Sequence, residues 1–214
     1  MCRLLYVNSK KEFLVADYLT KFSEISRNSK EFQGHGWGFA YLQGNEWKHY
    51  KNVNPIWEDN LSRFGTSTRL IAHARSAFKD EGIVVENNMP FYDDRYIYIF
   101  NGQLSGVKIK EKGRIGAEKI FNYIKRFDKG DIKDALEKGI EIIKKKSAYI
   151  RAMNIIITDS KAAYLYSHFN EEEEYFTIHY KLSDDSIVIC SQPFVDENSW
   201  QTIQNNSLTE YKCF

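Results

Sequence analysis

Cysteine and proline are scarce in this sequence, with three of each among 214 residues, and glycine occupies only 12 positions. Cys2, Cys190 and Cys213 lie far apart and are odd in number, which excludes a disulfide framework and the paired spacing of a zinc site. So few prolines and glycines argue against long flexible linkers, and we find no internal repeat. We therefore predict a single domain over residues 1–214.

The sequence also lacks an excess of either charge and any long hydrophobic run. Its 30 basic and 29 acidic residues give a net charge of +1, so we expect neither nucleic acid nor a membrane as a partner. No run has the length that a bilayer requires, and no signal segment opens the chain. Together with the unpaired cysteines, these features predict a cytoplasmic protein.

Metal and cofactor motifs are absent as well. The five histidines show no metal-type spacing. The segment "GHGWG" at 34–38 lacks the spacing and the strand–helix setting of a dinucleotide-binding loop. The sequence therefore offers no metal-site motif and no dinucleotide-binding motif.

Hydrophobic periodicity predicts the first strands and helices. Residues 2–7 read as a short buried strand, and Ser9 to Glu12 have the form of a helix capping box. The helix expected next carries one apolar face, and residues 36–51 read as two strands joined at Gly44-Asn45. That face consists of Leu14, Tyr18, Phe22 and Ile25.

The rest of the chain predicts two helices and then a run of strands. Residues 115–127 and 131–146 are helical in pattern, and Asp131 is a suitable N-cap for the second helix. The apolar faces are Ile120, Phe121, Ile124 and Phe127 in the first helix and Ile132, Leu136, Ile140 and Ile143 in the second. Strands are expected at 68–75, 94–102, 152–159, 162–169, 174–182 and 186–194, with 171–174 as a solvated turn. This order predicts an α+β fold with substantial antiparallel sheet.

Cys2 stands directly after Met1, where a nucleophile can use its own α-amine as the base. A cysteine nucleophile reacts as the thiolate, and an α-amino group with a pKa near ~8 can accept the thiol proton. This chemistry requires that Met1 is removed. The alternative is a strand cysteine that packs as a small hydrophobic residue.

Two further features supply groups that an acyl transfer needs. Asn101-Gly102 ends an apolar strand and offers an amide and a glycine N–H for an oxyanion, although Asn-Gly is also a common hairpin turn. Arg75 follows a strand and can bind a carboxylate with both arms of its guanidinium, although most arginines form surface ion pairs.

Several short motifs, taken in order, resemble the class II glutamine amidotransferases. The resemblance is strongest to their small stand-alone members, some of which act on γ-glutamyl compounds. It runs from residue 2 to about residue 195, and no single motif is decisive. The motifs are "MCRLL", "GHGWGFAY", "IAHARSAF", "NNMPF", "FNGQL", "GRIGAEKIF" and "CSQPF".

The resemblance implies a fold and a set of site residues. The fold is the four-layer αββα sandwich of N-terminal-nucleophile hydrolases, with two antiparallel sheets between helices. Cys2 falls on the family's nucleophile, and Asn101 and Gly102 fall on its oxyanion pair. The motif that binds the substrate carboxylate falls on Arg75, with Ser76 and Phe78 beside it as substrate-binding residues.

The chain also departs from the family pattern. Phe100 stands where a histidine usually precedes the oxyanion asparagine, Met89 replaces another histidine, and His35 replaces an acidic residue. Gly116 stands where the family carries the aspartate that holds the α-ammonium of glutamine. Glu118 lies two residues further on, which on a helix is a different face. A substrate with an acylated or missing α-amine would suit such a site better than free glutamine.

The resemblance therefore implies an amidohydrolase that cleaves the γ-amide of glutamine or a γ-glutamyl compound through a γ-glutamyl thioester. The implied reaction requires neither a metal nor an organic cofactor. Its partners would be the amide substrate and, in one version, a synthase subunit that accepts the ammonia; a homo-oligomer is also compatible with the sequence. The alternative is a catalytically weakened relative that binds a γ-glutamyl ligand or a partner protein. Retention of Met1 would favour that alternative.

Overall fold

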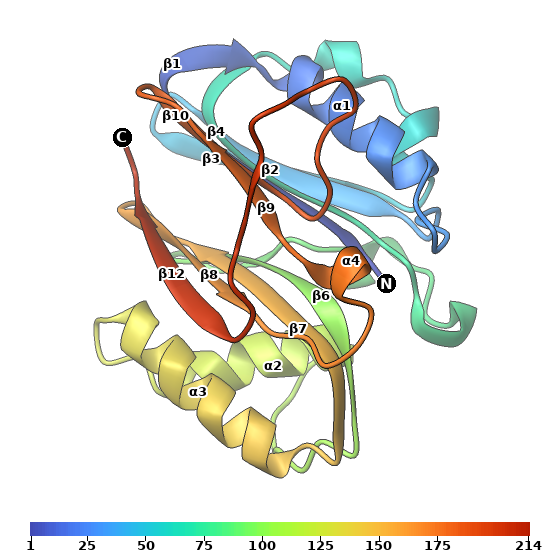
Figure 1. Ribbon diagram of the computed structural model, residues 1–214, viewed down its shortest axis with the longest axis vertical. Helices are drawn as coiled ribbons and strands as arrows, with labels where there is room; N and C mark the ends of the chain where they lie inside the picture. Colours follow the sequence, from blue (N-terminus) through green and yellow to red (C-terminus); the bar gives the residue numbers. More distant parts are fainter.

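The computed structural model describes all residues 1–214, and its strands form two antiparallel sheets (Figure 1). The seven-stranded sheet has the order β11-β9-β10-β1-β4-β2-β3, and the five-stranded sheet has the order β12-β8-β7-β6-β5. The first contains β1 (Arg3–Leu14), β2 (Trp37–Gln43), β3 (Glu46–Asn52), β4 (Thr66–Ala74), β9 (His179–Leu182), β10 (Ser186–Cys190) and β11 (Gln201–Thr202). The second contains β5 (Phe91–Tyr92), β6 (Ile97–Ser105), β7 (Tyr149–Thr158), β8 (Ala162–Ser167) and β12 (Ser207–Lys212).

Helices cover the outer faces of both sheets. The helix α1 (Val15–Arg27) lies on the seven-stranded sheet, and α2 (Gly116–Lys125) and α3 (Ile132–Lys146) lie on the five-stranded sheet (Figure 1). A short helix, α4 (Glu173–Phe176), lies beside the N-terminus (Figure 1). The layers are thus helix, sheet, sheet and helix, which confirms the predicted α+β, four-layer αββα sandwich.

Alternation along the strands decides which side chains lie between the sheets. In β4, Leu70 and Ala72 pack with α1, while Ile71 belongs to the core shared by both sheets. In β6, the ring of Tyr98 stacks on Phe121 of α2 at 4.8 Å. Because neighbouring strand residues point to opposite faces, the residues next to Tyr98 point between the sheets.

Several predicted local features are confirmed. The carboxylate of Asp131 accepts hydrogen bonds from the backbone N–H groups of Lys133 and Asp134, as expected of an N-cap. The turn between β2 and β3 lies at Gly44-Asn45, and Gly44 has a φ of +61°. The predicted apolar face of α3 is fully confirmed, since Ile132, Leu136, Ile140 and Ile143 are all buried.

The capping box at Ser9 to Glu12 is a wrong prediction. These residues lie inside β1, which continues to Leu14, and no side chain caps the start of α1. The reason is long-range pairing: Ser9 lies opposite Ser186 of β10, and β1 resumes its pairing with β4 after a register shift. Of the predicted apolar face of α1, Phe22 and Ile25 are buried as expected, whereas Leu14 is 53% exposed. Val15 and Leu19 complete the buried face.

The predicted strand at 174–182 is also partly wrong. Its first residues form α4, and only His179–Leu182 is a strand. Tyr175 and Phe176 are buried, and the backbone turns at Glu172, whose φ is 51°. Both rings pack in one cluster with Ala152 and Phe169, and this long-range contact replaces the predicted strand pairing.

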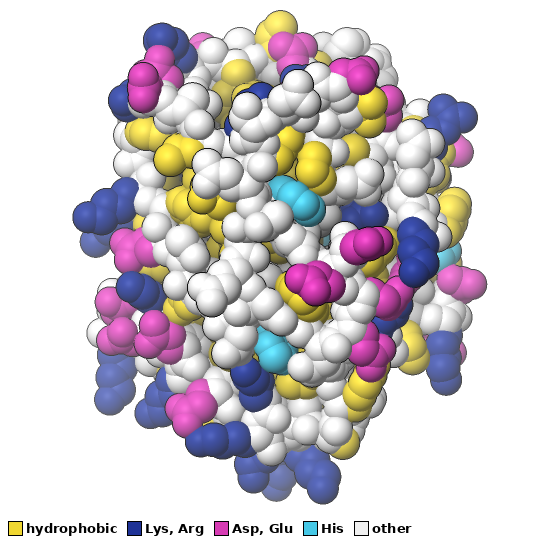
Figure 2. All heavy atoms as spheres, in the orientation of Figure 1, with side chains coloured by type: hydrophobic (Ala, Val, Ile, Leu, Met, Phe, Trp, Pro, Cys, Tyr) yellow, Lys and Arg dark blue, Asp and Glu magenta, His cyan; other side chains and the backbone are white.

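The outer surface carries both signs of charge. Figure 2 shows acidic and basic side chains interspersed over one face, with apolar side chains between them. None of the helices combines the length and the apolar character that crossing a membrane would demand.

Candidate active site

Cys2 and Arg75 are brought together by the pairing of β1 with β4. Arg3 lies opposite Ala74 and Leu4 opposite His73 in this antiparallel pair, so the next step places Cys2 opposite Arg75. Leu4 points into the core between the sheets, and Cys2, two residues earlier, points to the same side. The Cys2 thiol lies 3.7 Å from the carbonyl oxygen of Ser76, its hydrogen-bond acceptor.

The surroundings of Cys2 hold its thiol in the protonated form. Burial raises the pKa of the thiol, and the amino terminus and the Arg75 guanidinium offset only part of this effect. Because the thiolate is the reactive species, Cys2 needs a base within reach to become a nucleophile.

The guanidinium of Arg75 has no carboxylate partner. It is 5% exposed, and it donates hydrogen bonds to the carbonyl oxygens of Gly82, at 2.8 Å, and of Glu81, at 3.4 Å. These neutral acceptors orient the group and leave its charge uncompensated. Arg75 is therefore a buried cation available to an anionic ligand, and the surface ion pair considered from the sequence does not form.

Asn101 faces the same interior from the opposite sheet. Its side chain is fully buried, and neither the amide nitrogen nor the amide oxygen has a hydrogen-bond partner. Asn154, directly opposite on β7, has both ends bonded, to the carbonyl oxygen of Phe176 and to the Ser167 hydroxyl. An unpaired buried amide costs free energy, so Asn101 has the character of a binding group rather than a structural one.

Gly102 is required by close packing within the sheet. A Cβ atom here would collide with the carbonyl oxygen of Ala152 on β7 and would also press on the Phe100 ring. Phe100, which replaces the histidine of the family pattern, is buried on the helix side of the sheet. The Asn101-Gly102 pair thus lies within β6 and not in a hairpin turn.

His73 connects the two sheets at this point. Its Nε2 lies 3.2 Å from the carbonyl oxygen of Phe100, which can only accept, so Nε2 carries the proton. Burial lowers the pKa of His73 to about 3, which keeps the ring neutral. Its Nδ1 is buried without a partner. His73 Nδ1 and the Asn101 amide are thus buried polar groups without protein partners.

Among the remaining predicted residues, Ser76 alone makes a hydrogen-bond contact with Cys2. Ser76 is half-buried and contacts Cys2 through its carbonyl oxygen, whereas the Phe78 side chain is 65% exposed. Gly116 is the first residue of α2, and an added Cβ there would meet no atom within 4 Å. Both carboxylate oxygens of Glu118 are engaged by Arg114, so this residue does not replace the missing aspartate.

Sequence reasoning missed the residues that surround Met1. The amino terminus of Met1 pairs with the carboxylate of Glu31. Its carbonyl oxygen accepts hydrogen bonds from Gln33 Nε2, at 2.5 Å, and from the Tyr175 hydroxyl, at 2.7 Å. Glu31 and Gln33 lie in the loop after α1, and Tyr175 lies in α4. No sequence motif marks them, because three separate segments converge only in the fold.

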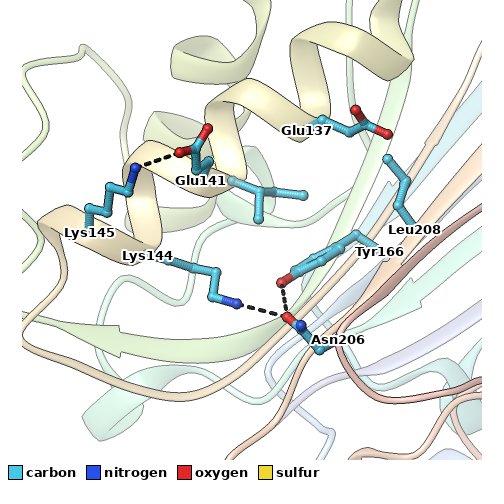
Figure 3. Close-up of a pocket in the computed structure, with 8 residues that line it drawn as sticks. Glu137, Glu141, Lys144, Lys145, Tyr166, Asn206 and Leu208 are labelled. Carbon is cyan, nitrogen blue, oxygen red and sulfur yellow. Dashed lines mark hydrogen bonds and ion pairs between the residues drawn. The ribbon is translucent and has the colours of Figure 1, made fainter.

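A cavity of about 400 Å³ lies elsewhere, between α3 and the strands β8 and β12 (Figure 3). Lys144 and Tyr166 both donate to the side-chain oxygen of Asn206, and Lys145 pairs with Glu141. Most of its polar groups bind one another, and the cavity contains none of the predicted site residues. No group of three or more His, Cys, Asp or Glu side chains is placed to hold a metal ion.

Comparison with known proteins identifies structural relatives only. No model of a protein family matches the sequence, and no curated protein matches it. A glutamine aminotransferase class-II domain protein from Silicibacter pomeroyi superposes with a TM-score of 0.65 at 16% identity, over 99% of each chain. A predicted glutamine amidotransferase from Pseudomonas aeruginosa gives 0.63 at 16% identity, over 99% of this chain and 97% of that one.

A larger relative contains the same fold as one part of its chain. Glutamine phosphoribosylpyrophosphate amidotransferase from B. subtilis gives a TM-score of 0.64 at 14% identity, over 99% of this chain and 49% of that one. The chain therefore has the fold of class II glutamine amidotransferase domains, which is the N-terminal-nucleophile hydrolase fold. At these identities the likeness establishes the fold alone, because one fold can carry many activities.

Proposed function

We propose that this protein is an N-terminal-cysteine amidohydrolase that cleaves the γ-amide of glutamine or of a γ-glutamyl compound. One observation carries the proposal. A cysteine at position 2 lies in register with Arg75, a buried arginine without a carboxylate partner, and the facing sheet presents Asn101, a fully buried asparagine without any partner. Packing does not require these three features together, whereas acyl transfer uses each of them.

The reaction begins once Met1 has been removed. The α-amine of Cys2 takes the thiol proton, and the sulfur attacks the γ-carbonyl carbon while Arg75 holds the substrate carboxylate. Asn101 Nδ2 and the Gly102 N–H stabilise the oxyanion. The C–N bond breaks as the α-ammonium returns its proton to the leaving nitrogen. Water then hydrolyses the γ-glutamyl thioester and regenerates the thiol.

The proposal is tested by the mass of the native N-terminus and by labelling. Protein isolated from its native host is expected to lack Met1 and to gain a single adduct at Cys2 from a glutamine-mimicking electrophile. The matched control is Cys190, a buried cysteine whose thiol pKa is raised to about 12 by burial and which should stay unlabelled. Quantitative retention of Met1 in the native host would rule out this mechanism.

Gly116 affects which substrate the proposed site would prefer. With no carboxylate at this position, the α-ammonium of free glutamine lacks its partner, so an α-N-acylated γ-glutamyl amide should be turned over better. Gly116→Asp should reverse the preference, because it restores the carboxylate that the family pattern carries at this position. The added side chain fits, since no atom lies within 4 Å of a Cβ there. Equal or better use of free glutamine by the unmodified protein would contradict this substrate class.

A second candidate function is binding without turnover. The three contacts on Met1 favour it, since they stabilise the unprocessed chain, in which the nitrogen of Cys2 is an amide and no base. In that case native protein keeps Met1 and binds a γ-glutamyl ligand reversibly. Whether the amidohydrolase works alone or passes ammonia to a synthase subunit is tested by adding such a partner and measuring the ammonia released.

A further inference from the structure

The residues around Met1 form a binding site for an α-amino acid that the chain itself occupies. The carboxylate of Glu31 pairs with the ammonium of Met1, and two donors, Gln33 Nε2 and the Tyr175 hydroxyl, bind its carbonyl oxygen. The Met1 side chain packs against an apolar cluster. This cluster consists of Ala152, Phe169, Tyr175 and Phe176.

The donors of this site are built into the fold. Gln33 is fully buried, and its amide nitrogen also donates to the carbonyl oxygen of Glu31, at 2.8 Å. The Tyr175 ring lies under the guanidinium of Arg3, 4.4 Å from its carbon. Arg151 holds the second carboxylate oxygen of Glu31 at 3.1 Å. These groups remain in place when Met1 is removed, because other contacts fix them.

This site lies next to the α-nitrogen of Cys2, where the leaving amine of a substrate must receive its proton. Met1 is bonded directly to Cys2, and two consecutive backbone nitrogens are about 2.7–3.7 Å apart, depending on ψ. An amine that binds to Glu31 in the space left by Met1 therefore lies next to the Cys2 nitrogen, while its carboxylate must lie further from that nitrogen than the bonded Met1 carbonyl carbon did. Transfer of a proton from the Cys2 α-ammonium to a leaving nitrogen needs the two nitrogens to lie this close.

On the basis of the proposed function, we infer that the space vacated by Met1 is the leaving-group subsite and that it accepts an apolar α-amino acid. The substrate class is then a γ-glutamyl amino acid. Its C–N bond breaks as the thioester forms, and the proton from the Cys2 α-ammonium goes to the departing nitrogen. Glu31 accepts a hydrogen bond from that amine, Gln33 and Tyr175 bind its carboxylate, and its side chain contacts the apolar cluster.

The first test compares amides with different leaving groups, using protein that begins at Cys2. We expect kcat/KM for γ-glutamyl-methionine to exceed that for the same amide without the leaving carboxylate by about tenfold or more. In Tyr175→Phe, the ratio of kcat/KM for γ-glutamyl-methionine to that for glutamine should fall about tenfold. The control is Tyr149→Phe, whose hydroxyl binds Glu171 on the surface and which should leave the ratio unchanged.

The second test measures binding of free L-methionine by calorimetry, with and without Met1. Saturable binding only to the protein that begins at Cys2 supports the subsite, even if no amide is hydrolysed and the proposed function fails. Hydrolysis of glutamine without methionine binding and without a preference for γ-glutamyl-methionine would overturn the subsite and leave the proposed function standing. Equal binding to both forms would also overturn it.

Discussion

At the scale of single residues, replacing Asn101 tests whether its amide has a functional or a structural role. Its buried amide has no partner, so Asn101→Leu should raise the free energy of unfolding by about 1–3 kcal/mol. The same change should lower kcat by a factor of about 10²–10³, because an oxyanion donor is lost. Urea unfolding and steady-state hydrolysis measure the two effects.

Asn154 is the matched control for this prediction. It is also fully buried and lies opposite Asn101, but its amide is bonded at both ends. Asn154→Leu should therefore lower the free energy of unfolding by at least about 2 kcal/mol, since its partners lose their bonds. If both variants were destabilised equally, Asn101 would be an ordinary structural residue.

His73 gives a prediction about acid stability. Burial lowers its pKa from 6.5 to about 3, so in acid the unfolded chain binds a proton that the folded chain does not. The free energy of unfolding should therefore fall as the pH decreases from about 6.5 toward 3, by about 1.4 kcal/mol per pH unit for this one group. In His73→Gln, urea unfolding at pH 6.5, 5.5 and 4.5 should show a slope smaller by that amount; an unchanged slope would contradict a neutral buried His73.

At the scale of strands and helices, substitution by alanine should have opposite effects on stability at two glycines that were predicted to lie near the site. Gly102→Ala places a Cβ against the carbonyl oxygen of Ala152 and should destabilise the β6–β7 pair by about 1–3 kcal/mol. Gly116→Ala meets nothing at the start of α2 and should be neutral or stabilising by up to about 1 kcal/mol. Thermal unfolding compares them, and a harmless Gly102→Ala would disprove the close approach of β7.

At the scale of the whole molecule, the two sheets share one core, so the chain should unfold as a unit. The four tryptophans lie in or beside the seven-stranded sheet, whereas α2 and α3 cover the five-stranded sheet. Tryptophan fluorescence and helical circular dichroism should therefore report coincident urea transitions. Two separate transitions would contradict the prediction of a single domain over residues 1–214.

Many local features of this protein can be predicted from its amino-acid sequence. Local hydrophobic periodicity predicts α2 and α3, and single residues predict the N-cap at Asp131 and the turn at Gly44-Asn45. These features can be predicted because they depend on residues that are neighbours along the chain. The position of Cys2 after Met1 and the order of the motifs also indicated the fold. The same local reasoning failed at Ser9 to Glu12, where pairing with β4 and β10 overrides a helix signal.

Long-range packing determines which groups lie together in the candidate site. The register of β1 on β4 places Arg75 beside Cys2, and facing sheets leave the Asn101 amide without a partner. The Met1 site depends on three segments that are far apart in the chain and carry no common motif. Such contacts depend on the register between strands and on which faces of the sheets and helices are buried. Neither the register nor the burial can be read from a residue's neighbours along the chain.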